Sequence, residues 1–219
     1  MRRSAEFCTD WTVVIPVKPA AHGKSRLTGA GDRVALARAI ALDSIEAACA
    51  VCAVVVVTAD AEVAVEARLL GATVVDETAP AGLNAAIAAG VDATGPGHRA
   101  AMLGDLPALR PADLADALRR AAALERTVVA DAEGTGSTLV TARAGVPWAA
   151  AFGDGSLARH LALGAVALDA APSLRRDVDT PAQLEAAARL GLGARTATLV
   201  TPRRAAEAPS PRQKKDGAR

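Results

Sequence analysis

The chain has 219 residues and a formal net charge of +1, and it is 51% hydrophobic, with two tryptophans, two phenylalanines and no tyrosine. A chain of this length can bury one sizeable core, and it lacks the apolar run of roughly 18–20 residues that a membrane helix needs. We therefore expect a cytoplasmic protein with one domain, a core of small aliphatic side chains and no membrane partner.

Charge is distributed unevenly along the chain. Residues 203–219 contain six lysine and arginine residues against two acidic ones, and the stretch after Val200 has three prolines and little that is apolar. This composition predicts a basic disordered tail over 201–219, after a folded domain over 11–200 and an N-terminal extension over 1–10. A basic tail could contact nucleic acid. The folded part is slightly acidic and nearly free of aromatic side chains for base stacking, so we expect no nucleic-acid partner.

Apolar runs of strand length alternate with helical patterns, which is typical of a layered α/β sheet. We expect, in chain order, a strand at 11–18, a helix at 31–50, a strand at 52–58, a helix at 61–70, a strand at 72–75, a helix at 82–91, a strand at 98–107, a helix from Pro111, strands at 127–131 and 137–143, and helices at 156–163 and 181–191. The early strands should be parallel, and later ones are free to run antiparallel. Ligands of such sheets gather beyond the carboxyl ends of the strands, where Asp60 is one candidate.

The loop after the first strand, KPAAHGKSRL over 18–27, contains the Gly-Lys-Ser of a P-loop. The Walker pattern needs a glycine five residues before Gly23, because its backbone N–H groups wrap the phosphates. Lys18 occupies that position, so the pattern fails. What remains is a basic loop in which Lys18, Lys24 and Arg26 suit an anionic ligand.

The three cysteines are Cys8, Cys49 and Cys52, and the last two form a C-x-x-C pair in an apolar context. A zinc site would need a second pair of ligands, and a redox motif would need the pair to open a helix. We therefore interpret them as buried, reduced thiols.

Two segments place carboxylates where a cation could bind. Asp105 lies in LGDLP at the end of the fourth expected strand, and Asp177 and Asp179 form a D-x-D pair that shares one side of an extended chain. Magnesium prefers such oxygen ligands. On spacing alone, DVDTP is more typical of a helix N-cap provided by Asp179 or Thr180, with proline at the first helical position. The two interpretations are compatible.

Glycines and hydroxyl residues recur in EGTGSTLV over 133–140 and FGDGSLARH over 152–160. Ser156 would open a short helix, where its hydroxyl and free backbone N–H groups could hold a phosphate. The alternative is an ordinary turn followed by an N-cap. His22 and His160 are isolated, so we assign them to surface or supporting positions.

With these segments in this order, the chain resembles the phosphoenolpyruvate or 2-phospho-L-lactate guanylyltransferases of coenzyme F420 biosynthesis. The resemblance spans roughly residues 11–192 and rests on VIPVKPAAHGKSRL, VVVVTAD, GLNAAI, LGDLP, GTGSTLV, FGDGSLARH and RRDVDTPAQL. It implies an α/β nucleotidyltransferase domain over 11–200, GT-A-like and Rossmann-like, with a mixed sheet flanked by helices.

The resemblance also implies roles for particular residues. Those expected to bind phosphoenolpyruvate are Thr138, Gly153 and Ser156. Those expected to hold Mg²⁺ are Asp105, Asp177 and Asp179. Those expected along the triphosphate, with catalytic roles, are Lys18, Lys24 and Arg26. The base and ribose would meet Asn84, with Gly82 and Leu83 beside it.

The implied reaction transfers GMP from GTP to the phosphate of phosphoenolpyruvate, and the product passes to the next enzyme of the pathway. Such an acceptor phosphate is largely ionised at neutral pH, so no general base is needed. The acceptor could instead be 2-phospho-L-lactate, which differs at one carbon. The fold could also serve another cofactor or a sugar phosphate, or bind nucleotide without catalysis.

Overall fold

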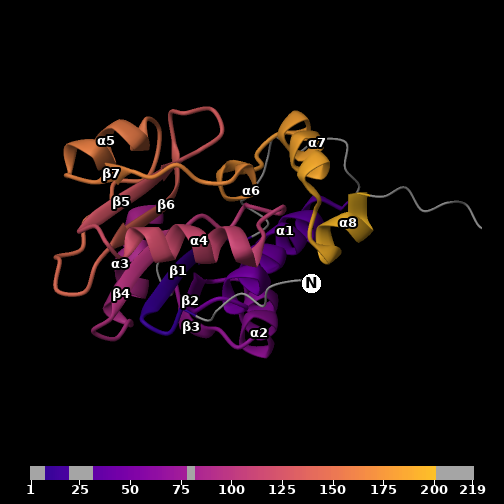
Figure 1. Cartoon of the computed structure of the whole chain (residues 1–219). Coiled ribbons are helices and arrows are strands. Elements are labelled where there is room, and N and C mark those ends of the chain that lie inside the picture. The colour runs from indigo at the N-terminus through magenta and orange to yellow at the C-terminus, as the bar shows by residue number, and fades with distance from the viewer. Residues whose placement is uncertain (1–7, 20–31, 78–81, 201–219) are drawn as a thin grey trace, which may run out of the picture.

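A seven-stranded sheet organises the part of the chain that the computed structural model describes, residues 8–19, 32–77 and 82–200 (Figure 1). The strands are β1 (Trp11–Val17), β2 (Ala53–Thr58), β3 (Thr73–Asp76), β4 (His98–Met102), β5 (Arg126–Ala130), β6 (Ser137–Ala142) and β7 (Val166–Ala167). The helices are α1 (Arg33–Cys49), α2 (Ala61–Leu69), α3 (Leu83–Asp92), α4 (Pro111–Ala121), α5 (Ser156–Ala162), α6 (Pro172–Arg175), α7 (Pro181–Leu190) and α8 (Ala194–Val200). Over these residues, none of the helices combines the length and apolarity needed to cross a bilayer.

The strand order is β3-β2-β1-β4-β6-β5-β7. β1 pairs in parallel with β2 and β4, and β2 pairs in parallel with β3. β6 runs antiparallel between β4 and β5, while β7 is parallel to β5. The prediction of a mixed α/β sheet with parallel early strands is confirmed.

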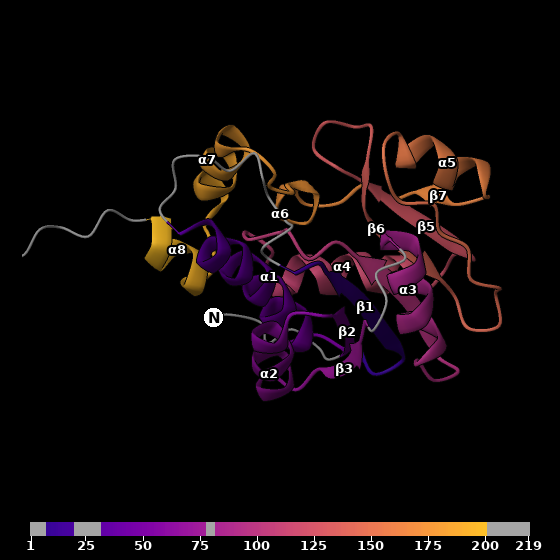
Figure 2. The ribbon, with the colours of Figure 1, turned by 180° about the vertical axis from the view of Figure 1, so that it is seen from behind.

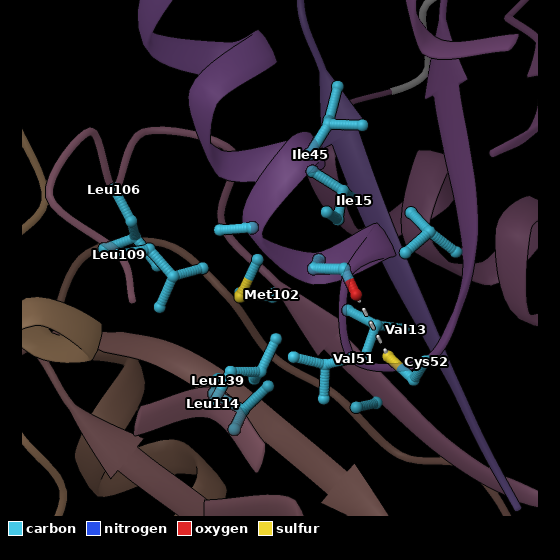
Figure 3. Packing of buried hydrophobic residues seen from close by; sticks show 14 of the residues in the cluster. Val13, Ile15, Ile45, Val51, Cys52, Met102, Leu106, Leu109, Leu114 and Leu139 are labelled. Atoms are coloured by element: carbon cyan, nitrogen blue, oxygen red, sulfur yellow. Dashed lines mark hydrogen bonds between the residues drawn. The ribbon is translucent and has the colours of Figure 1, made fainter. Parts of the chain in front are cut away.

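Helices cover both faces of the sheet because its central strands are apolar on both sides. Val13 of β1 faces α1 and α4, where it shares a buried cluster with Ile45 and Leu114 (Figure 3). Its neighbour Val14 points to the opposite face and packs with Ile87 of α3. Figure 1 accordingly shows α4 in front of the sheet, and Figure 2 shows α3 in front from the other side.

The predicted strand over 98–107 is shorter in the structure, because β4 ends at Met102. The Leu103 N–H still donates to the Thr138 carbonyl at 2.9 Å, after which the chain turns and the Leu106 N–H donates to Ser44 Oγ at 3.1 Å. The apolar pattern continues past the strand because Leu106 is itself buried in the core. Asp105 therefore lies in a turn beyond the strand end.

The other predicted elements match the structure to within two residues at each end, but β7, α6 and α8 were not predicted. β7 has two residues and α6 has four, too few to give a periodic pattern. The N-terminus of α8 is capped from α1, where the Asp43 carboxylate accepts the N–H groups of Arg195 and Thr196. A cap that comes from so far along the chain leaves no local sequence signal.

The three cysteines are free thiols, as the sequence predicted, but only Cys52 is buried, whereas Cys8 and Cys49 are half-buried. Burial raises the pKa of Cys49 to about 11 and that of Cys52 to about 12. The Cys52 thiol donates to the Ala48 carbonyl at 3.7 Å inside the core (Figure 3). Thiols held protonated in this way are poor nucleophiles and poor metal ligands.

Candidate active site

A cavity of about 770 Å³ opens beyond the carboxyl ends of β1 and β4. Its walls come from the end of β1 with Lys18, from Gly104 and Asp105, from the turn that leads into β6, and from residues 152–156. Asp177 and Asp179 complete it from the segment before α7. Segments distant in sequence thus converge where ligands of open α/β sheets bind.

The three predicted metal ligands meet in this cavity. Asp105, Asp177 and Asp179 each offer a carboxylate oxygen, and these oxygens all lie within 4.8 Å of one another. A backbone hydrogen bond from the Val178 N–H to the Asp105 carbonyl, 3.1 Å long, joins the two segments. The spacing suits one divalent cation bound by oxygen ligands.

The electrostatics of Asp177 support a cation at this point. Its Oδ1 atom is buried and finds no hydrogen-bond partner among residues 8–19, 32–77 and 82–200. Burial, followed by the charges of Asp105, Glu133 and Asp131, raises the pKa of Asp177 to about 7. A bound divalent cation would supply the missing partner and offset the repulsion between carboxylates. The donor set fits Mg²⁺ or Mn²⁺.

The structure also settles which residue caps α7. Thr180 Oγ1 accepts the Gln183 N–H at 3.3 Å, and Gln183 Oε1 accepts the Thr180 N–H at 3.0 Å, forming a capping box. The Asp179 N–H also donates to Gln183 Oε1, at 2.9 Å. Thr180 is therefore the cap, and the Asp179 carboxylate can face the cation.

The cationic side of the cavity includes one residue that was predicted and one that was missed. Lys18 is exposed directly after β1 and lines the cavity, whereas Lys24 and Arg26 lie outside the described residues. Arg38 of α1 also lines the cavity. Its position depends on the packing of α1 against α2, so no local motif identifies it.

Asp60 supports Arg38 and does not line the cavity itself. It caps α2 by accepting the N–H groups of Glu62 and Val63, at 3.1 and 3.3 Å. Its second oxygen accepts Arg38 Nε–H at 3.0 Å, and Arg38 also pairs with Glu62. Asp60, which the sequence suggested as a ligand contact at a strand end, therefore holds Arg38 in place at the cavity.

Gly153 and Ser156, two of the three predicted acceptor ligands, also line the cavity. Gly153 has φ +123°, a conformation that favours glycine. Ser156 is buried as the first residue of α5, and its N–H donates to the Gly153 carbonyl at 3.0 Å. Gly155, at φ +65°, occupies the N-cap position, so the alternative interpretation of Ser156 as an N-cap is wrong.

Thr138, the third predicted acceptor ligand, directs its side chain elsewhere. Its hydroxyl is fully buried and donates to the Leu174 carbonyl at 2.7 Å. The preceding residue, Ser137, lines the cavity instead. The pairing of β5 with β6 is irregular here, because Val129 pairs with Leu139 and Ala130 with Ser137, which leaves Thr138 as an extra residue in β6.

The predicted nucleotide contacts at the start of α3 also take other positions. Gly82, at φ +95°, is the N-cap of α3, and Leu83 lines the cavity. The Asn84 side chain donates from Nδ2 to the Phe152 carbonyl at 3.0 Å and accepts the Phe152 N–H at 2.8 Å. It is not among the side chains that line the cavity.

A tight turn shapes the cavity wall before β6. Asp131 accepts the N–H groups of Thr135 at 2.9 Å and Gly136 at 2.8 Å. A Cβ atom on Gly136 would lie 2.4 Å from Asp131 Oδ2, so a larger residue would displace the Asp131 carboxylate from its hydrogen bonds. The sequence indicated that the glycines of this segment could bind a ligand, but it did not identify Asp131 as the residue whose carboxylate fixes the turn.

Of the two isolated histidines, His22 lies outside the described residues, and His160 is buried behind the cavity wall. His160 Nδ1 lies 3.0 Å from Ser137 Oγ, and Nε2 accepts the Ala151 N–H at 2.8 Å. The prediction of a supporting position for His160 agrees with this arrangement.

Comparison with known proteins points to one family. Residues 11–167 match the family described as "Guanylyl transferase CofC like". A phosphoenolpyruvate guanylyltransferase of Thermomonospora curvata is 50% identical over 200 residues, covering 86% of this chain and 88% of the relative. A protein of the same name from Streptomyces coelicolor is 48% identical over 201 residues, covering 86% and 95%.

Solved structures share the fold at lower identity. A homologue of Rv0371c from Mycobacterium sp. strain JC1 has a TM-score of 0.55 at 22% identity and covers 83% of this chain and 96% of that one. The 4-diphosphocytidyl-2C-methyl-D-erythritol synthase of Anaerococcus prevotii has a TM-score of 0.51 at 11% identity, covering 85% and 96%. The expected nucleotidyltransferase fold is thereby confirmed.

Proposed function

This chain belongs to the guanylyl transferase family described as CofC-like, and from that membership we propose that it transfers GMP from GTP to phosphoenolpyruvate. The products would be enolpyruvyl-diphospho-5′-guanosine and pyrophosphate. One observation carries the proposal: three aspartates, Lys18 and a wall of glycine and serine residues line a single cavity. The product would pass to the next enzyme of coenzyme F420 biosynthesis.

The two substrates, GTP and phosphoenolpyruvate, are both polyanions that repel each other. The enzyme must therefore accelerate the reaction mainly by positioning them and by neutralising their charge. The acceptor phosphate is already a nucleophile near pH 7, because the second pKa of phosphate esters lies at about 6. His160 is not needed as a base, and both of its ring nitrogens are engaged. Attack on the α-phosphorus forms one P–O bond, and the bond to pyrophosphate breaks.

We propose that Asp105, Asp177 and Asp179 hold Mg²⁺. When bound, the cation neutralises charge on the acceptor phosphate and the α-phosphate and polarises the reacting phosphorus. The Asp177 oxygen that is buried without a partner among the described residues supports its place as a direct ligand. Asp179, more exposed and fixed through its backbone to Gln183, would complete the set.

Lys18 would stabilise the leaving pyrophosphate, joined by Lys24 and Arg26 as the family resemblance implies. Arg38 lines the same cavity and adds a fixed cation on the α1 side. The resemblance assigns Gly82 and Asn84 to the base and ribose, but at the start of α3 it is Leu83 that lines the cavity, and it offers an apolar surface there. Side-chain cations would thus replace the wrapped backbone of a P-loop.

The acceptor would bind along the wall formed by Gly153 and Ser156. The serine hydroxyl and the backbone held open by Gly153 are suited to phosphate or carboxylate oxygens. Thr138 was expected here as well. Because its hydroxyl donates to Leu174, any contribution from Thr138 would come from its backbone or from shaping β6.

The test is to incubate the full chain with GTP, Mg²⁺ and either phosphoenolpyruvate or 2-phospho-L-lactate, measuring pyrophosphate release and the mass of the guanylylated product. Because the product can be labile, the assay is repeated with the next pathway enzyme and its deazaflavin acceptor. We expect release with phosphoenolpyruvate. Release with 2-phospho-L-lactate alone would reverse the acceptor, and no release with either would overturn the proposed reaction.

A further inference from the structure

Ser137 is a cavity residue whose hydroxyl has an unusual partner. It lies at the start of β6, it is 3% exposed, and it is one of the residues that line the cavity, together with Gly153 and Ser156. Ser137 Oγ is 3.0 Å from Nδ1 of His160, which is 1% exposed. The ring of His160 is further fixed by an edge-on contact with Phe152, with ring centroids 4.9 Å apart.

The second nitrogen of His160 determines which way the hydrogen bond to Ser137 runs. The Ala151 backbone N–H can only donate, and it donates to Nε2 at 2.8 Å, so Nε2 carries no proton. Burial, followed by the charge of Arg159, lowers the pKa of His160 to about 4, so the ring is neutral at pH 7. A neutral ring with a bare Nε2 carries its proton on Nδ1, and His160 therefore donates to Ser137 Oγ.

A hydroxyl oxygen that accepts from His160 must direct its own proton elsewhere. Within residues 8–19, 32–77 and 82–200, the Ser137 hydroxyl makes no hydrogen bond other than the one with His160, so no protein acceptor takes that proton. The open side of the residue is the cavity. The same geometry excludes a nucleophilic serine, because a nitrogen that already carries a proton cannot remove another.

We propose that Ser137 donates its hydroxyl proton to an anionic oxygen of the acceptor, and that His160 is the positioning residue that aims this donor. The inference rests on the proposed function and adds a residue that sets acceptor affinity. No covalent step is involved. His160 also holds the Ala151 backbone, so the direction of the hydroxyl and the position of the 152–156 wall are fixed by one ring.

The test measures steady-state kinetics of Ser137→Ala in the full chain with GTP, Mg²⁺ and phosphoenolpyruvate. Loss of a hydrogen bond to a charged group should raise the acceptor KM roughly 10- to 100-fold and leave the KM for GTP within about twofold. Ser137→Thr, which keeps the hydroxyl, should restore most of the affinity. The matched control is Ser173→Ala, which removes a buried serine hydroxyl bonded to Asp113, outside the cavity.

His160 is tested by its coupling to Ser137. His160→Gln should raise the acceptor KM in the unsubstituted background and raise it by a smaller factor when Ser137 is already alanine, because the part of its effect that acts through the Ser137 hydroxyl is then already lost, while the part that acts through Ala151 remains. A histidine with a purely structural role would give effects that multiply. If Ser137→Ala does not fold, Ser137→Cys replaces it, since a thiol has similar size and is a weak donor.

These kinetic measurements distinguish failure of the inference about Ser137 from failure of the proposed function. An unsubstituted enzyme that turns over phosphoenolpyruvate, with a Ser137→Ala variant whose acceptor KM is unchanged, would overturn this inference and leave the proposed function in place. An unsubstituted enzyme that does not use phosphoenolpyruvate would overturn the proposed function and, with it, this inference.

Discussion

Asn84 and Phe152, 68 residues apart in the chain, are joined by two hydrogen bonds between the Asn84 carboxamide and the Phe152 backbone. Through them, α3 fixes the start of the 152–156 segment, which forms one wall of the cavity. The family resemblance assigns Asn84 to the nucleotide. The geometry connects it instead to the side of the cavity where the acceptor is proposed to bind.

Replacement of Asn84 distinguishes these two assignments. Asn84→Ala removes two hydrogen bonds, each with a net contribution of about 1 kcal/mol, and should raise the acceptor KM by about tenfold while the KM for GTP changes little. Steady-state kinetics with each substrate varied in turn provide the measurement. Asp92→Ala, an exposed change on the same helix, is the control. A rise confined to the KM for GTP would return Asn84 to the nucleotide site.

Asp60 should contribute to stability through two separate interactions. Asp60→Ala removes the cap of α2 and the partner of Arg38, and we expect the free energy of unfolding to fall by about 1–2 kcal/mol for the cap alone. Asp60→Asn keeps a capping oxygen and loses only the charge, so its loss should be smaller. Urea denaturation of both variants gives the comparison. Equal losses would show that the cap contributes nothing measurable.

Gly136 should be intolerant of any side chain. In Gly136→Ala, the new Cβ atom would displace the Asp131 carboxylate, and the turn that carries the cavity wall would shift. We expect the free energy of unfolding to fall by about 1–3 kcal/mol, the usual cost of overpacking, together with lower turnover. Gly95→Ala, where a Cβ atom meets nothing within 4 Å, is the matched control. Similar denaturation midpoints for the two variants would contradict the geometry.

The depressed pKa of His160 predicts how stability changes in mild acid. Its pKa falls from an ordinary value of 6.5 to about 4, chiefly through burial, so between these values the unfolded chain binds a proton that the folded chain does not. Stability should therefore decrease as pH falls from about 6.5 to about 4. His160→Gln should flatten that part of the profile, measured by denaturation at several pH values. An unchanged slope in the variant would contradict the assignment.

Much of the site could be predicted because its residues belong to short segments with a recognisable order. Asp105, Asp177 and Asp179 were expected to meet, and their oxygens do lie close together. The D-x-D pattern places Asp177 and Asp179 on one side of an extended chain, whereas their meeting with Asp105 was expected from the family resemblance. Gly153 and Ser156 follow from the same kind of segment, and both line the cavity.

The remaining features depend on how distant elements pack. Whether Ser137 or Thr138 faces the cavity depends on the phase of β6, which a uniformly buried strand does not reveal. Arg38 lines the cavity while it pairs with Asp60 and Glu62 at the start of α2. The Asn84 side chain bonds to the backbone of Phe152, which lies 68 residues further along the chain. Such contacts follow from tertiary structure and leave no mark on local sequence patterns.

The central claim is that the enzyme transfers GMP to phosphoenolpyruvate in the cavity that Asp105, Asp177 and Asp179 line. Its most direct test is a single-turnover experiment with Mg²⁺ and GTP that carries a radioactive label on the α-phosphate. The unsubstituted enzyme should form a labelled product only when phosphoenolpyruvate is present. Asp105→Asn, folded by circular dichroism, should form it at least about a hundredfold more slowly, the scale for loss of one preorganised electrostatic group. Near-normal transfer by a folded Asp105→Asn variant, or no acceptor-dependent label in the unsubstituted enzyme, would contradict the claim.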